Sequence, residues 1–143
     1  MSIERYRALV DQLCARLHAS RPSVAGQSAV FFVDGSEFTL FHGGMLVPDS
    51  VVLYCDFGEL PEQSREPILL RLLETNMYLF AQHTPAFTYS PARNRVVLMC
   101  RFGLAQADLE STLELMAFFA GMARRWAQDH FLFDNGLAGR GIS

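Results

Sequence analysis

The residues that could carry chemistry are few and widely spaced. The histidines are His18, His42, His83 and His130, and their spacing matches no HExxH or other metal-ligand motif. A scattered histidine is far more often a surface or hydrogen-bonded residue than a ligand or a catalytic base. The histidines therefore predict neither a metal site nor acid–base catalysis.

The cysteines, Cys14, Cys55 and Cys100, form no CxxC pair. An odd number at wide spacing supports neither a disulfide framework nor a zinc site. It is typical of free thiols in a reducing cytoplasm. Cys14 falls within an expected helix, and no nearby group would activate it as a nucleophile.

Carboxylates near strand ends are the remaining catalytic option. Asp34, Asp56 and Glu59 could approach one another, but a hydrolase would need two of them in one cleft. Turn chemistry already accounts for Asp34. The loop at Gly43-Gly44 is similar to a fragment of an oxyanion loop, but no GxSxG follows it, and no GxxxxGK[ST] or GxGxxG occurs. We expect no cofactor, and an enzyme using a carboxylate or Cys14 is the less favoured alternative.

Composition indicates a globular chain. Of 143 residues, 50% are apolar and 19% are charged, which is enough apolar material for one core. We expect a single domain over residues 1–134. The last residues, 135–143, include three glycines and little to bury, and we expect a flexible tail there.

Charge and hydropathy exclude two kinds of partner. The net charge is −3 and no basic run occurs, so nucleic acid is not expected as a partner. No apolar run of 18 residues occurs, so no membrane insertion is expected. The first residues carry Glu4, Arg5, Arg7 and Asp11, unlike a signal peptide, so we expect a cytoplasmic protein.

The first half of the chain predicts one helix and three strands. Apolar residues recur every three or four positions from about Ile3 to Ala19. Two runs rich in Val and Phe then flank an Asp-Gly pair, which is a strong β-hairpin signal. The expected strands are Ser28–Val33, Ser36–Phe41 and Ser50–Phe57.

The second half predicts a helix, a hairpin and a closing helix. The central helix should begin properly at Pro67 and end near Gln82, and its apolar stripe is broad. A helix that is apolar on more than one face must be buried on more than one face, and a second copy of the same helix is the simplest cover. The expected later elements are a hairpin of Ala86–Ser90 and Arg95–Phe102, and a helix over Ala107–Asp129.

This order favours an α+β fold: an antiparallel, twisted five-stranded sheet with three helices in the order α-β-β-β-α-β-β-α. Three helices do not easily cover both faces of such a sheet, so some apolar surface should stay open for a partner. In the first hairpin we expect Phe32, Phe38 and Leu40 on one face, with Phe31 and Phe41 on the other.

The segment Arg71–Phe80 (RLLETNMYLF) resembles the "LLEANLF" helix of the class I type III secretion chaperones, the Tir-chaperone (CesT-like) kind. The surroundings resemble that family as well. A Leu60-Pro61-Glu62 turn precedes the helix, a hairpin containing Thr88–Leu98 follows it, and a helix closes the chain. The resemblance runs from about Ile3 to Asp129.

The resemblance implies a bacterial cytoplasmic homodimer that binds the N-terminal segment of a secreted effector in extended form, without ATP or a cofactor. It implies a dimer interface on the central helix, for which the expected residues are Leu69, Leu72, Leu73, Asn76, Met77 and Phe80. It also implies effector-binding patches on the first helix and the strands, for which the expected residues are Leu13, Leu17, Phe32, Phe38 and Leu40. The alternative is a non-enzymatic regulatory or adaptor protein on the same fold that binds a different protein.

Overall fold

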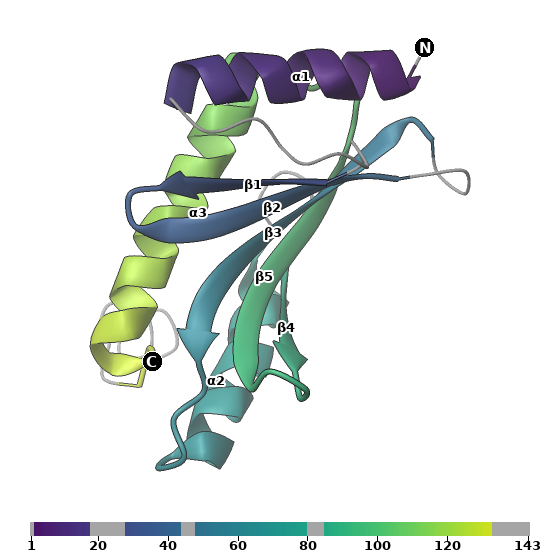
Figure 1. Ribbon diagram of the computed structural model, residues 1–143. Coiled ribbons are helices and arrows are strands. Elements are labelled where there is room, and N and C mark those ends of the chain that lie inside the picture. Colours follow the sequence, from purple (N-terminus) through teal and green to yellow (C-terminus); the bar gives the residue numbers. More distant parts are fainter. Residues whose placement is uncertain (1, 18–27, 44–47, 80–84, 133–143) are drawn as a thin grey trace.

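The computed structural model describes residues 2–17, 28–43, 48–79 and 85–132 (Figure 1). In chain order the elements are α1 (Ser2–Leu17), β1 (Ser28–Val33), β2 (Ser36–His42), β3 (Ser50–Glu59), α2 (Arg65–Tyr78), β4 (Ala86–Ser90), β5 (Arg95–Gly103) and α3 (Leu109–Asp129). The five strands form one antiparallel sheet in the order β1-β2-β3-β5-β4. The α+β class and the element order predicted from the sequence are confirmed.

Element boundaries differ from the sequence-based ones by a few residues. Helix α2 begins at Arg65, two residues before Pro67, and its last residue is Tyr78. The expected end of that helix near Gln82 lies outside the described residues, as do Phe80 and the expected tail at 135–143. Strand β3 continues two residues beyond Phe57, to Glu59.

The β1–β2 hairpin turns at Asp34 and Gly35, which have φ angles of 51° and 85°. Two consecutive positive φ angles define a type I′ turn, which matches the twist of the flanking strands and fixes their register. Phe31 therefore lies opposite Phe38, and Phe32 lies opposite Glu37. This corrects the expected faces: Phe31, not Phe32, shares a face with Phe38.

One face of the sheet forms the core with all three helices. The alternate strand residues Ala29, Phe31, Phe38, Leu40, Val51, Leu53, Cys55, Phe57, Phe87, Val96, Leu98, Cys100 and Phe102 are buried. They join a single cluster with Leu13 of α1, Leu72 of α2 and Trp126 of α3. Figure 1 shows α1 across one end of the sheet and α2 at the other, with α3 running between them. Most of the stability of the fold comes from this face.

The opposite face of the sheet remains accessible in the part of the chain that the structure describes. Its residues are exposed or half-buried: Val30, Phe32, Glu37, Thr39, Phe41, Val52, Tyr54, Val97 and Met99. Phe41 and Tyr54 are packed edge to face there, with ring centroids 5.2 Å apart. The apolar surface that the sequence predicted to remain open is therefore present on this face.

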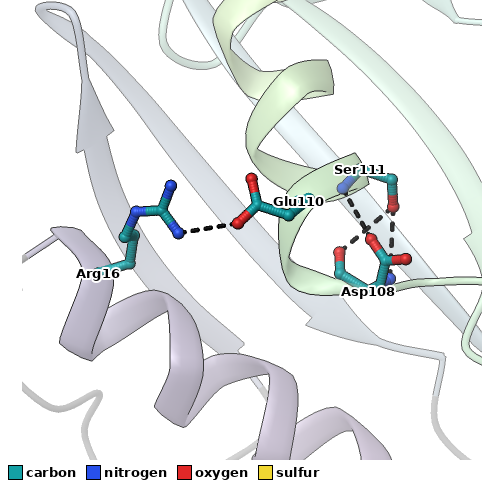
Figure 2. A network of polar contacts seen from close by, with 4 residues as sticks. All are labelled: Arg16, Asp108, Glu110 and Ser111. Carbon is teal, nitrogen blue, oxygen red and sulfur yellow. Dashed lines mark hydrogen bonds and ion pairs between the residues drawn. The ribbon is translucent and has the colours of Figure 1, made fainter.

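Polar contacts hold α1 and α3 in place. The Tyr6 hydroxyl of α1 donates to the Leu40 carbonyl at 3.0 Å, and burial raises the pKa of Tyr6 to about 12. At the other end of α1, Arg16 forms a 2.9 Å ion pair with Glu110 of α3 (Figure 2). The Asp108 side chain caps α3 by accepting from the Ser111 N–H, which lowers the pKa of Asp108. Because Arg16 and Glu110 are exposed, their pair orients α1 more than it stabilises it.

The hairpin register can be tested by paired substitutions. Phe38 has no exposed surface, whereas 64% of Phe32 is exposed. We expect Phe38→Ala to lower the free energy of unfolding by about 3–5 kcal/mol, because it leaves a core cavity. Phe32→Ala should change it by about 1 kcal/mol at most. Urea denaturation followed by Trp126 fluorescence measures both; equal losses would contradict the register.

Candidate functional site

Helix α2 is pinned to the sheet at its N-terminal end. The Arg65 guanidinium donates to the Tyr89 hydroxyl at 2.7 Å and to Asn94 Oδ1 at 3.1 Å. The Asn94 amide in turn donates to the Leu60 carbonyl at 3.0 Å, which ties the β4–β5 turn to the segment between β3 and α2. These contacts fix where α2 leaves the sheet.

Farther along α2, two more side chains bond to distant backbone. Arg71 donates to the Phe131 carbonyl at 2.6 Å, just beyond α3. Asn76 makes a two-way contact with Phe87 of β4: Asn76 Oδ1 accepts from the Phe87 N–H at 2.7 Å, and Asn76 Nδ2 donates to the Phe87 carbonyl at 3.3 Å. With both ends held, one side of α2 is set toward the core and the other toward the outside.

The outer side of α2 is strongly apolar. Leu70, Leu73, Met77 and Tyr78 are each more than half exposed, and the opposite side buries Ile68, Leu72 and Thr75. Exposed apolar side chains that lie together on one helix make this side a candidate protein-binding surface. We call Leu70, Leu73, Met77 and Tyr78 the α2 outer face.

The structure separates the expected interface residues. Leu73 and Met77 belong to the α2 outer face, and Leu69 is half-buried. Leu72 is a core residue, and the Asn76 amide is bonded to Phe87 of the same chain. The expected interface set omitted Leu70 and Tyr78, although the breadth of the apolar stripe signalled them.

A second apolar feature lies on β1, at one edge of the sheet. Val30 is 47% exposed and Phe32 is 64% exposed. In a hairpin with a two-residue turn, the residues that flank the turn bond to each other and the pattern then alternates. The backbone N–H and C=O of Val30 and Phe32 therefore point away from β2. Exposed apolar side chains and outward backbone groups thus coincide on the same residues.

The other expected effector-binding residues lie elsewhere. Leu13, Phe38 and Leu40 have no exposed surface, and Leu17 is half-buried at the end of α1. A docked segment could reach the first three only by opening the core. Of the expected set, Phe32 is therefore the residue with a large accessible surface, and Val30 is an accessible neighbour that sequence reasoning missed.

A shallow hollow near the β1–β2 turn is lined in part by charged residues. It has a volume of about 330 Å³ and includes Phe32, Asp34, Asp56, Arg95 and Arg124 in its lining. Both oxygens of Asp56 accept from Arg95 Nε at 2.9 Å, and Asp56 Oδ1 also accepts from the backbone N–H of Gly58. Asp34 and Arg124 form a looser pair at 3.8 Å. Each of these two carboxylates is therefore paired with an arginine near the end of the sheet.

The buried thiols of Cys55 and Cys100 have raised pKa values, which lowers their reactivity. Burial, with a smaller effect of the Asp56 carboxylate, raises the pKa of Cys55 to about 12, and burial raises the pKa of Cys100 to about 12. Within residues 2–17, 28–43, 48–79 and 85–132, no group of three or more His, Cys, Asp or Glu residues could hold a metal ion. No helix in those ranges is long and apolar enough to span a membrane.

Comparison with known proteins gives a family match and several matches of fold. The model of the Tir chaperone protein (CesT) family matches residues 12–127. No curated protein matches the sequence.

Three solved structures share the fold. The ExsC–ExsE complex matches with a TM-score of 0.72 and 18% identity, over 92% of this chain and 97% of that one. The HopA1–SchA chaperone–effector complex matches with a TM-score of 0.68 and 13% identity, over 90% and 97%. The type III secretion chaperone SycH of Yersinia pestis, solved with a fragment of YscM2, matches with a TM-score of 0.63 and 13% identity, over 84% and 98%. At these identities the likeness shows the fold.

The thiols provide a test of how closed the core is. At pH 8, a thiol with a pKa of about 12 is ionised in roughly one molecule in ten thousand. In a Cys14→Ser variant, we expect Cys55 and Cys100 to resist a thiol-specific reagent in the folded protein. Both should react fully in denaturant. Fast labelling of either thiol under native conditions, measured by intact mass, would contradict the burial described here.

Proposed function

We propose a function from one premise: the chain belongs to the Tir chaperone protein (CesT) family. The proposed function is that of a type III secretion chaperone, which binds the N-terminal segment of a secreted effector in extended form and keeps it soluble. Two structures that share the fold are described as a chaperone–effector complex and as a type III secretion chaperone. The family match covers most of the α+β domain and is the main support for the proposal.

The observation that carries the binding mode is the β1 edge. An extended segment can bond to the outward backbone groups of Val30 and Phe32 and so extend the sheet. Its alternate side chains then lie beside the exposed Val30 and Phe32 side chains, which lose their contact with water. The segment loses conformational entropy on binding, and many small contacts over a long surface offset that loss.

The proposed role is binding without catalysis, in the bacterial cytoplasm and without a cofactor. Three observations support this role. The Asp56 carboxylate is held in an ion pair with Arg95, burial raises the pKa of the Cys55 thiol, and the hollow beside them is shallow. Covering apolar side chains of an unfolded segment prevents its aggregation, and this needs only complementary surface.

The α2 outer face supports the second part of the proposal, a homodimer. Leu73 and Met77 are 65% and 67% exposed on a helix whose position is fixed by the contacts of Arg65 and Asn76. Two copies of one helix pack on each other around a two-fold axis, which covers the row in both subunits. Leu69 is half-buried beside this row, and Leu72 lies on the buried side of the helix. Phe80 lies outside the described residues and remains an expected interface residue.

The dimer is tested by a charge on the α2 outer face. We expect Leu73→Asp or Met77→Asp to give a folded monomer, because each buries an unpaired carboxylate only when the dimer forms. The matched control is Phe118→Asp on α3, whose residue is 49% exposed and lies off α2. Sedimentation velocity should show a dimer for the control and a monomer for the α2 variants. A folded dimer for both α2 variants would overturn the proposed interface.

The proposed binding of the effector at the β1 edge is tested by removing one outward backbone N–H. Because the Val30 N–H points away from β2, Val30→Pro removes no ladder hydrogen bond and should leave the domain folded. We expect Val30→Pro and Phe32→Asp each to lower capture of the effector about tenfold or more, whereas Val30→Thr should not. Affinity capture from the native cell, with limited proteolysis and mass spectrometry, identifies the protected segment. Protection of a folded domain, rather than an N-terminal segment, would favour the adaptor alternative.

A further inference from the structure

The two edges of the sheet differ in how their backbone groups are used. Strands β1 and β4 are the edge strands. An exposed edge strand presents unpaired N–H and C=O groups that invite pairing with another chain, so proteins usually block edges that serve no purpose. At β1 the outward groups of Val30 and Phe32 have no hydrogen-bond partner among the residues that the structure describes.

At β4 the corresponding groups are occupied. Asn76 accepts from the Phe87 N–H at 2.7 Å and donates to the Phe87 carbonyl at 3.3 Å. A side-chain amide has one donor and one acceptor side, as a peptide group does, so Asn76 takes the place that a neighbouring strand would take. Because the backbone N–H and C=O of Phe87 point away from β5, the alternating pattern makes Tyr89 the next residue whose backbone groups point outward. The backbone groups of Thr88 point toward β5.

Neighbouring residues leave little else to pair at β4. The strand has five residues, Ala86–Ser90. The preceding outward position is Pro85, which has no N–H to donate. With both groups of Phe87 taken, a strand approaching β4 would find a full pair of outward backbone groups at Tyr89 and not at Phe87.

We propose that Asn76 closes the β4 edge against strand pairing, so that an extended segment is directed to β1. Asn76 acts on client binding through the edge that it blocks, and in that respect the inference rests on the proposed function. The direct consequence of the proposal does not depend on that function: without the Asn76 amide, the β4 edges of two molecules should pair.

Geometry gives this pairing a specific signature. If β4 of one molecule pairs antiparallel with β4 of another through Phe87 and Tyr89, then each Phe87 lies opposite a Tyr89. The two copies of Thr88 then face each other as a non-hydrogen-bonded pair, with Cα atoms roughly 4.5 Å apart. Cysteines at that position are close enough to form a disulfide. The native Cys14, Cys55 and Cys100 are all buried and do not compete.

The experiment compares Asn76→Ala with its parent in a Thr88→Cys background, using the full chain without any client. Mild oxidation followed by non-reducing electrophoresis measures the linked dimer. The matched control is Arg65→Ala, which loosens the N-terminal attachment of α2 to the same hairpin but leaves Phe87 bonded to Asn76. Urea denaturation of each variant sets conditions of equal folded fraction.

We expect several times more linked dimer for Asn76→Ala than for the parent or for Arg65→Ala. If the linking came only from a loss of stability, the amount of linked dimer would rise equally in Asn76→Ala and Arg65→Ala, and that result would overturn the proposal. Strong linking in the parent would also overturn it, since β4 would then be open with Asn76 in place. None of these results bears on the Val30→Pro and Phe32→Asp capture test, so the two proposals fail separately.

A measurement on the unmodified chain keeps the proposal testable if Asn76→Ala does not fold. Amide hydrogen exchange by NMR should show the Phe87 N–H protected, and the N–H groups of Val30 and Phe32 exchanging much faster. Exchange of Phe87 as fast as that of Phe32 would contradict a closed β4 edge.

Discussion

The register of the β1–β2 hairpin determines which side chains of this protein belong to its core and which are available to a partner. The turn at Asp34 and Gly35 allows one pairing, in which Phe31 faces Phe38. Because side chains alternate along a strand, a shift of one residue would exchange the two faces of β1. The same turn also points the backbone of Phe32 outward. One local conformation therefore supplies both the core contact and the edge to which an extended segment can bond.

Helix α2 lies beside β4, at the other edge of the sheet, and divides its side chains between the core and the surface. Its inner side buries Ile68 and Leu72, while its outer side keeps Leu73 uncovered. Side-chain hydrogen bonds to distant backbone, such as that of Asn76 with Phe87, hold the helix against β4. A helix held in this way presents its apolar row in a fixed orientation, so a second copy need not order it on association. Rigid placement of α2 thus favours both the proposed dimer and the proposed closure of the β4 edge.

Local sequence patterns were sufficient to predict the elements and their order, because turns and apolar periodicity depend on residues that are close together in the sequence. The family resemblance in the central helix was confirmed by the family match. The expected faces of the first hairpin were wrong, although the two-residue turn already required Phe31 to pair with Phe38. The contact between Asn76 and Phe87 could not be predicted, since it joins a side chain to backbone whose position depends on the folded sheet. Exposure of Phe32 and burial of Leu40 likewise depend on tertiary packing.

One open edge in each subunit has a consequence for the proposed dimer. Strand addition at β1 is short, since two residues, Val30 and Phe32, offer outward groups beside exposed apolar side chains. Such a contact binds weakly when it acts alone. In a dimer, a single client segment that is long enough to span both subunits meets the second edge at high effective concentration, and the combined affinity rises without any new contact. If β4 also accepted strands, one segment could bridge different dimers and promote aggregation. A closed β4 edge therefore keeps the gain from two sites within one complex, which is what a soluble carrier of an unfolded segment requires.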